Sequence, residues 1–329
     1  MGQLTLSVHP INGQDTGEGS RAAPLKTLRE ALRRSEPGTV IELAPGRYLA
    51  ANGEQFPIQI PPQRRVIGPT SGGTAILQGS GALSHPVLGL AEVTCVVADQ
   101  AQLENLTLTN PEPRGIGLWI DQGRPIVQTV QCTGCDRYGM VILDEAIPTV
   151  LAAQLLNNRE AGLALFRRGK GSLIRLQCRQ NTVGIAVFDQ AAPLIQNCDI
   201  SQNQTGIAIT DTARPVLRGN QVRQNQAYGL RNQGQGSPDL GVAQDEGLNV
   251  FRDNGQADIQ NQGPTLVSCG NDLLPQRLEG TVALIASEIP DPVAVPEPLL
   301  AIASGAPTPV TPPTLPAPTP APPAPIPTA

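Results

Sequence analysis

The sequence predicts an all-β protein, a single-stranded right-handed parallel β-helix of about ten coils with 22 or 23 residues each. The first observation is a unit that recurs along the chain, aligned on Pro125, Pro148, Gly171, Pro193 and Pro215. The second is that the units carry short, alternating, β-branched segments such as GIAVF and GIAIT. A repeat of this period indicates a solenoid, and such segments indicate strands rather than helices.

Equivalent residues of stacked coils lie in columns about 4.8 Å apart. The most regular coils, over 115–235, contain three apolar columns that we expect to form the core: Val127, Val150, Leu173, Ile195, Leu217; Cys132, Leu155, Cys178, Ile200, Val222; and Met140, Leu163, Ile185, Ile207, Leu230. A polar column holds Asn158, Asn181, Asn203 and Asn225. Asparagine tolerates the left-handed backbone of a turn, and stacked amides can bond to one another.

The β-helix is expected to span residues 1–287. Residues 24–35 predict an N-terminal capping helix, because Leu25, Leu28 and Leu32 fall on one face after a proline suited to the first turn. Residues 266–286 are expected to close the other end. Residues 288–329 are rich in proline and predict a disordered tail or spacer, whose PxxP-like spacing leaves open a protein partner.

Charge and hydropathy exclude several classes of protein. The formal net charge of −5 provides no basic field for nucleic acid. No apolar run is long enough for a transmembrane segment, and the N-terminus lacks the features of a signal peptide. The sequence therefore leaves the compartment unknown: cytoplasmic by default, exported if the true start lies upstream.

The segments LSVHPINGQDTGEGSRAAPLKTLREAL, GTVIELAPGRY and TAILQGSG resemble the bacterial DUF1565 domain. The later coils are similar to NosD-type, pectin-lyase-like β-helix repeats, and the resemblance covers about residues 4–275. It implies a β-helix with kinship to carbohydrate-active proteins. It provides no agreed catalytic motif to transfer.

The turn before each proline carries an aspartate in the segments DQGRP, DEAIP, DQAAP and DTARP. Carboxylates about 5 Å apart can bind Ca²⁺ or act in glycoside hydrolysis, which makes Asp144 and Asp189 candidate metal ligands. No cofactor is certain, and Ca²⁺ is the one considered. The alternative is that aspartate only caps the turn through its own backbone.

One coil replaces this aspartate with FRRGKG. Arg167 or Arg168 is a candidate base, and Lys170 a candidate neutraliser of a uronate carboxylate, as a lyase acting on acidic polysaccharide requires. An ordinary basic turn would have the same sequence. Four residues past each column glycine, counting Gly115 as the first, come three aromatic residues, Trp119, Phe166 and Phe188, which either stack on sugars or pack at the corner.

The leading hypothesis is a polysaccharide-binding β-helix, with lyase or hydrolase activity left open. One alternative is a non-catalytic scaffold of the cell envelope, and another is a NosD-like accessory protein in metal or cofactor maturation. His9 and His85 both precede the regular coils, which argues against a histidine metal site or a Ser-His-Asp triad. The six cysteines are expected to be free core residues.

Overall fold

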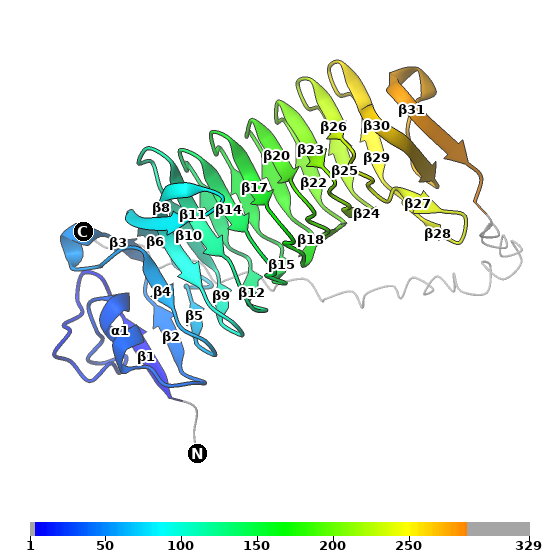
Figure 1. Cartoon of the computed structure of the whole chain (residues 1–329). Coiled ribbons are helices and arrows are strands. Elements are labelled where there is room, and N and C mark those ends of the chain that lie inside the picture. The colour runs from blue at the N-terminus through cyan, green and yellow to red at the C-terminus, as the bar shows by residue number, and fades with distance from the viewer. Residues whose placement is uncertain (1–3, 288–329) are drawn as a thin grey trace, which may run out of the picture. The chain divides into compact units, whose positions relative to one another are not determined.

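The computed structural model describes residues 4–287, which form stacked coils with three parallel sheets, A, B and C (Figure 1). Sheet A comprises β1 (Thr5–Val8), β2 (Val40–Leu43), β5 (Arg65–Ile67), β9 (Gln102–Glu104), β12 (Ile126–Gln128), β15 (Thr149–Leu151), β18 (Ser172–Ile174), β21 (Leu194–Gln196) and β24 (Val216–Arg218). Sheet B comprises β3 (Gly46–Tyr48), β6 (Ala75–Gln78), β10 (Leu106–Thr109), β13 (Gln131–Thr133), β16 (Gln154–Leu156), β19 (Gln177–Arg179), β22 (Asp199–Ser201), β25 (Gln221–Arg223) and β29 (Val250–Arg252).

Sheet C runs through β4 (Ile58–Ile60), β8 (Gly89–Val97), β11 (Gly115–Ile120), β14 (Tyr138–Ile142), β17 (Ala161–Leu165), β20 (Val183–Val187), β23 (Thr205–Asp211), β26 (Tyr228–Gly234), β30 (Ala257–Cys269) and β31 (Leu278–Ile285). Each regular coil contributes one strand to each sheet, and we name its turns the A–B, B–C and C–A corners. This arrangement confirms the predicted fold class. The proline-rich tail predicted for 288–329 lies outside the described residues.

The predicted apolar columns are confirmed as the core. Strand pairing aligns Val127 with Val150, Cys132 with Leu155, and Met140 with Leu163, and the columns continue in register through the later coils. All fifteen of these side chains are buried. The six cysteines are buried and none forms a disulfide, and burial raises the pKa of the Cys132 thiol well above its ordinary value.

The asparagine column forms a continuous ladder inside the B–C corner. Asn181 is typical: its Oδ1 accepts from the backbone N–H and the Nδ2 of Asn158, and its Nδ2 donates to Asn203 Oδ1 at 3.0 Å and to the Leu155 carbonyl at 2.9 Å. The ladder continues to Asn254 and ends on Asp258 Oδ1. Each amide therefore stabilises the coil on either side of it.

The N-terminal helix is shorter than the predicted 24–35. It is α1 (Leu28–Arg34), because Leu25 forms a bridge with Val8 and Thr27 is the N-cap. The Glu54 carboxylate accepts bonds from the first two helical N–H groups, and η1 (Ala50–Asn52) lies just before it. Leu28 is buried in the core cluster, and the helix packs against β1 and β2 of the first coils.

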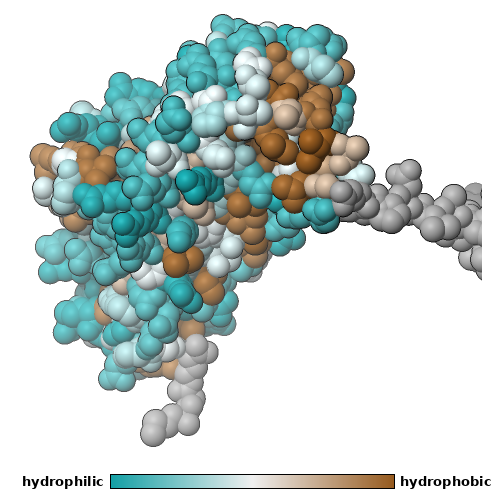
Figure 2. All heavy atoms as spheres, turned by 45° about the vertical axis from the view of Figure 1, so that its right-hand side comes forward, coloured by the Kyte–Doolittle hydropathy of each residue, from teal (hydrophilic) through white to brown (hydrophobic). Residues whose placement is uncertain are grey.

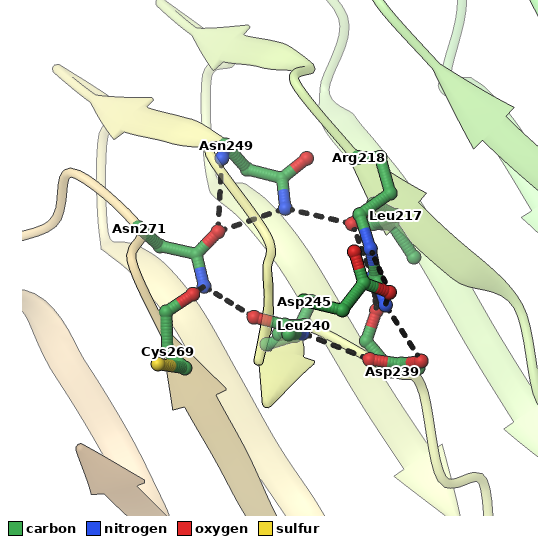
Figure 3. Close-up of polar contacts among 9 residues, drawn as sticks. Leu217, Arg218, Asp239, Leu240, Asp245, Asn249, Cys269 and Asn271 are labelled. Atoms are coloured by element: carbon green, nitrogen blue, oxygen red, sulfur yellow. Dashed lines mark hydrogen bonds and ion pairs between the residues drawn. The ribbon is translucent and has the colours of Figure 1, made fainter. Parts of the chain in front are cut away.

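The C-terminal end is closed by strands rather than by a helix. A second asparagine ladder, not predicted, passes from Asn220 through Asn249 to Asn271. Figure 3 shows its step from Asn249 to Asn271. Beside it the small hairpin of β27 (Gly241–Val242) and β28 (Asp245–Glu246) is held by Arg218, which bonds Asp239 and Asp245. After η2 (Pro275–Arg277), β31 forms the sheet edge. Figure 2 shows apolar side chains gathered near that end of the described chain.

Candidate functional site

The C–A corner contains the predicted aspartate column. Asp144, Asp189 and Asp211 adopt left-handed backbone, as does Arg167 in the coil between the first two. Asp189 Oδ2 accepts from the Arg167 N–H at 2.7 Å, and Asp211 Oδ2 accepts from the Asp189 N–H at 3.1 Å. Asp189 and Asp211 therefore satisfy backbone donors of the neighbouring coil, a structural role that differs from the capping of their own turn that the sequence left open.

Asp144 and Asp189 do not form the paired ligand set that the calcium prediction requires. The register places Arg167 between them, so their backbones lie two coils, about 9 to 10 Å, apart. Asp144 faces the guanidinium of Arg167, and Asp189 accepts from a backbone N–H. Within residues 4–287 no group of three or more histidine, cysteine or acidic side chains is arranged to hold a metal ion.

A groove of about 720 Å³ opens at this corner. Arg167 Nε lies 3.3 Å from Asp144 Oδ1, and the more exposed Arg168 lies 3.3 Å from Glu145. The groove therefore presents guanidinium and carboxylate groups side by side on neighbouring coils. Its lining residues are Val87, Asp144, Glu145, Arg167, Arg168, Asp189 and Gln190.

Lys170 is exposed but does not line this groove. Its backbone N–H donates to the Ala146 carbonyl, as a residue leaving the corner toward sheet A. The structure thus brings Arg167 and Arg168 together with Asp144, while Lys170 lies apart from them.

His85 is the site residue that sequence reasoning missed. It ends β7 (Gly81–His85), which pairs antiparallel with β8 and forms a hairpin on the outside of sheet C (Figure 1). His85 Nε2 lies 3.2 Å from Asp144 Oδ2, and Nδ1 accepts from the Val87 N–H. Because Nδ1 accepts this hydrogen bond, Nε2 is the ring nitrogen that bears the hydrogen, and it donates a hydrogen bond to Asp144 Oδ2. The two partners are 59 positions apart in the sequence, which leaves no local signal for this contact.

The aromatic column needs a correction. Sheet pairing aligns Trp119 with Val141, two residues away from the Leu143, Phe166 and Phe188 column. The error arose from choosing Gly115, whereas Leu118 pairs with Met140 and so places Gly117 beside Gly139.

All three aromatic side chains nevertheless contribute to a second apolar cluster on the outer face of sheet C. Phe166 and Phe188 stack with ring centroids 4.6 Å apart. Trp119 is fully buried and makes a T-shaped contact with His85, 5.3 Å between centroids, so direct stacking of Trp119 on a sugar would require the hairpin to move. Phe188 is the partly exposed member of the stack.

Several solved structures share the fold. Pectate lyase Pel9A matches with a TM-score of 0.56 and 15% identity, over 87% of this chain and 78% of that one. An alginate lyase from Paenibacillus sp. strain FPU-7 matches with a TM-score of 0.51 and 12% identity, over 87% of this chain and 100% of that one. XylC, solved with xylose, matches with a TM-score of 0.51 and 8% identity, over 86% and 70%. Because the sequence identities are this low, these structural matches establish only that the chain has the right-handed β-helix fold.

No curated protein sequence matches the chain. No helix among residues 4–287 is long and apolar enough to span a membrane. A family model described as a protein of unknown function, DUF1565, matches residues 11–278, which is most of the chain. The coil register, the N-terminal helix and this match agree, and the chain belongs to the DUF1565 family.

Proposed function

We propose that this protein binds polysaccharide in the groove at the C–A corner. The observation that carries the proposal is the placement of Arg167 and Arg168 in one open groove, on coils that also carry the stacked rings of Phe166 and Phe188 just outside its lining. Guanidinium groups bind carboxylates in a planar, bidentate manner, and an aromatic face packs on the apolar face of a ring. Polysaccharides that contain uronic acids offer both groups. The fold shared with a pectate lyase and an alginate lyase supports the same class of ligand.

The contacts favour binding over cleavage. A base for β-elimination must be free to accept a proton from the substrate. Arg167 and Arg168 each face a carboxylate, and both ring nitrogens of His85 have a partner. We therefore assign Arg167 and Arg168 to ligand binding, with Asp144 and His85 as positioning residues.

The test is affinity electrophoresis of the full chain in gels that contain polygalacturonate or alginate, with dextran as a neutral polymer. The test variant is Arg167→Ala/Arg168→Ala. The control is Arg124→Ala/Arg214→Ala, which removes the same charge from exposed arginines of the same corner outside the groove lining. Lys170→Ala separately tests the role that the sequence predicts for that residue.

We expect retardation by an acidic polymer that the groove variant loses and the control retains. The proposal fails if neither acidic polymer retards the wild-type chain, or if the control loses binding equally. Unsaturated uronide absorbance or new reducing ends, measured on the same mixtures, would show that the groove also catalyses cleavage and would overturn the assignment of binding alone.

A further inference from the structure

A second groove runs along the B–C corner, at the other end of sheet C from the arginine groove. It has a volume of about 610 Å³, and its lining extends over six coils, from Pro111 to Gln226, or five coil spacings of about 4.8 Å, roughly 24 Å. Two rows of side chains border it. One row comprises Gly134, Asn157, Gln180 and Gln202, and the other comprises Asp136, Arg159, Thr182, Gln204 and Gln226.

The floor and the borders of this groove differ in their hydrogen bonding. The floor includes Asn158 and Asn181, whose amides are engaged in the buried ladder. The side chains of Gln180, Gln202 and Gln204 are exposed and make no hydrogen bond to any other residue within 4–287. The borders therefore present unused amide donors and acceptors in rows parallel to the helix axis.

The glutamines are not explained by the backbone. Gln180, Gln202 and Gln224 have φ values of 58°, 58° and 54° in three successive coils. A left-handed residue with a Cβ costs about 1–2 kcal/mol, which glycine and asparagine avoid or reduce. The A–B corner has the same conformation but mixed residues, among them Ala152, Arg175 and Asn197. Glutamine fills this position in three successive coils of the B–C corner, a run that the A–B corner lacks, which indicates that these side chains have a use.

The chemistry of the lining defines the ligand. An amide both donates and accepts, as a sugar hydroxyl does. Asp136 and Arg159 are paired at 3.0 Å, and the lining holds no other charged residue and no aromatic one. A charged polymer therefore gains no net attraction, and a peptide finds no apolar pocket. We propose that this groove binds a neutral, hydroxyl-rich glycan chain, extended along the helix axis. The site is additional to the arginine groove and does not depend on it.

The test removes the amides without straining the backbone. In Gln180→Gly/Gln202→Gly, glycine accepts the left-handed conformation more readily than glutamine, so folding is preserved. The matched control is Arg175→Gly/Asn197→Gly, which makes the same change at left-handed positions of the A–B corner. Each full-length chain is run in gels that contain hydroxyethylcellulose, galactomannan or dextran, and thermal unfolding of each variant is recorded.

We expect at least one neutral polymer to retard the wild-type chain and the control. Loss of two neutral hydrogen bonds should weaken binding at least about fivefold in the glutamine variant. The Arg167→Ala/Arg168→Ala variant should still bind. The inference is overturned if no neutral polymer is bound, if the glutamine variant binds as tightly as the control, or if the arginine variant loses the neutral polymer.

Discussion

The asparagine ladder permits a quantitative prediction at Asn181. The side chain is buried and makes four hydrogen bonds, two accepted from Asn158 and one donated to each of Leu155 and Asn203. Asn181→Ala removes all four and leaves the buried Asn158 N–H without its acceptor. At about 1 kcal/mol net for each bond, the free energy of unfolding should fall by about 4 kcal/mol.

The assay is urea unfolding followed by circular dichroism, comparing midpoints at equal slope. Gln177→Ala is the control, because Gln177 belongs to the same coil, is exposed and makes no side-chain hydrogen bond within the described range. The control should change stability by no more than about 0.5 kcal/mol. A loss below about 1 kcal/mol in Asn181→Ala, or one equal to that of the control, would refute the view that the ladder ties the coils together.

Three further predictions concern the capping helix, the hairpin and the arginine groove. Hydrogen bonds from Arg33 and Arg34 lower the pKa of Glu30 from 4.5 to about 2, so the stability that Glu30 adds to the fold is complete above about pH 4.5 and is lost as pH falls toward 2. Burial raises the pKa of Glu54, so its contribution to stability is complete below pH 4.5 and is lost as pH rises through its folded pKa. Thermal unfolding against pH should therefore show opposite differences from wild type for Glu30→Gln and Glu54→Gln; parallel curves would contradict both assignments. His85→Ala should uncover the chain's single tryptophan, so that its emission shifts to the red and acrylamide quenches it more strongly, and the free energy of unfolding should fall by about 1 kcal/mol. Unchanged emission would show that the hairpin covers Trp119 without His85. Glu145→Gln frees the exposed Arg168 and should tighten binding of polygalacturonate by about two- to fivefold, while equal or weaker binding would mean that Arg168 does not contact the polymer.

The sequence predicted the coils well because their register is a local property repeated along the chain. One column of apolar residues, once aligned, determines the pairing of every strand that follows, as Val127 and Val150 illustrate. The alignment of coils was wrong where one coil contained two glycines that could match the repeat, since Gly115 was chosen and Gly117 is the one beside Gly139. The repeat could not predict the position of His85, because His85 lies in a hairpin outside the coils. The geometry of that hairpin, and not the coil register, places His85 beside Asp144.

The three corners differ in a way that bears on where ligands bind. Strand pairing and core packing determine most of the residue types within the three sheets. The corners share a left-handed backbone. The A–B corner carries mixed residues there, whereas the B–C corner carries amides from Asn157 to Gln224 and the C–A corner carries charges from Asp144 to Asp211. Because the backbone conformation is the same at each corner, folding alone does not explain why the side chains differ between corners. If both grooves bind independently, the losses caused by Arg167→Ala/Arg168→Ala and Gln180→Gly/Gln202→Gly should each be confined to one class of polymer and should not change when the variants are combined. Coupling between them would instead indicate one branched ligand that spans sheet C from corner to corner.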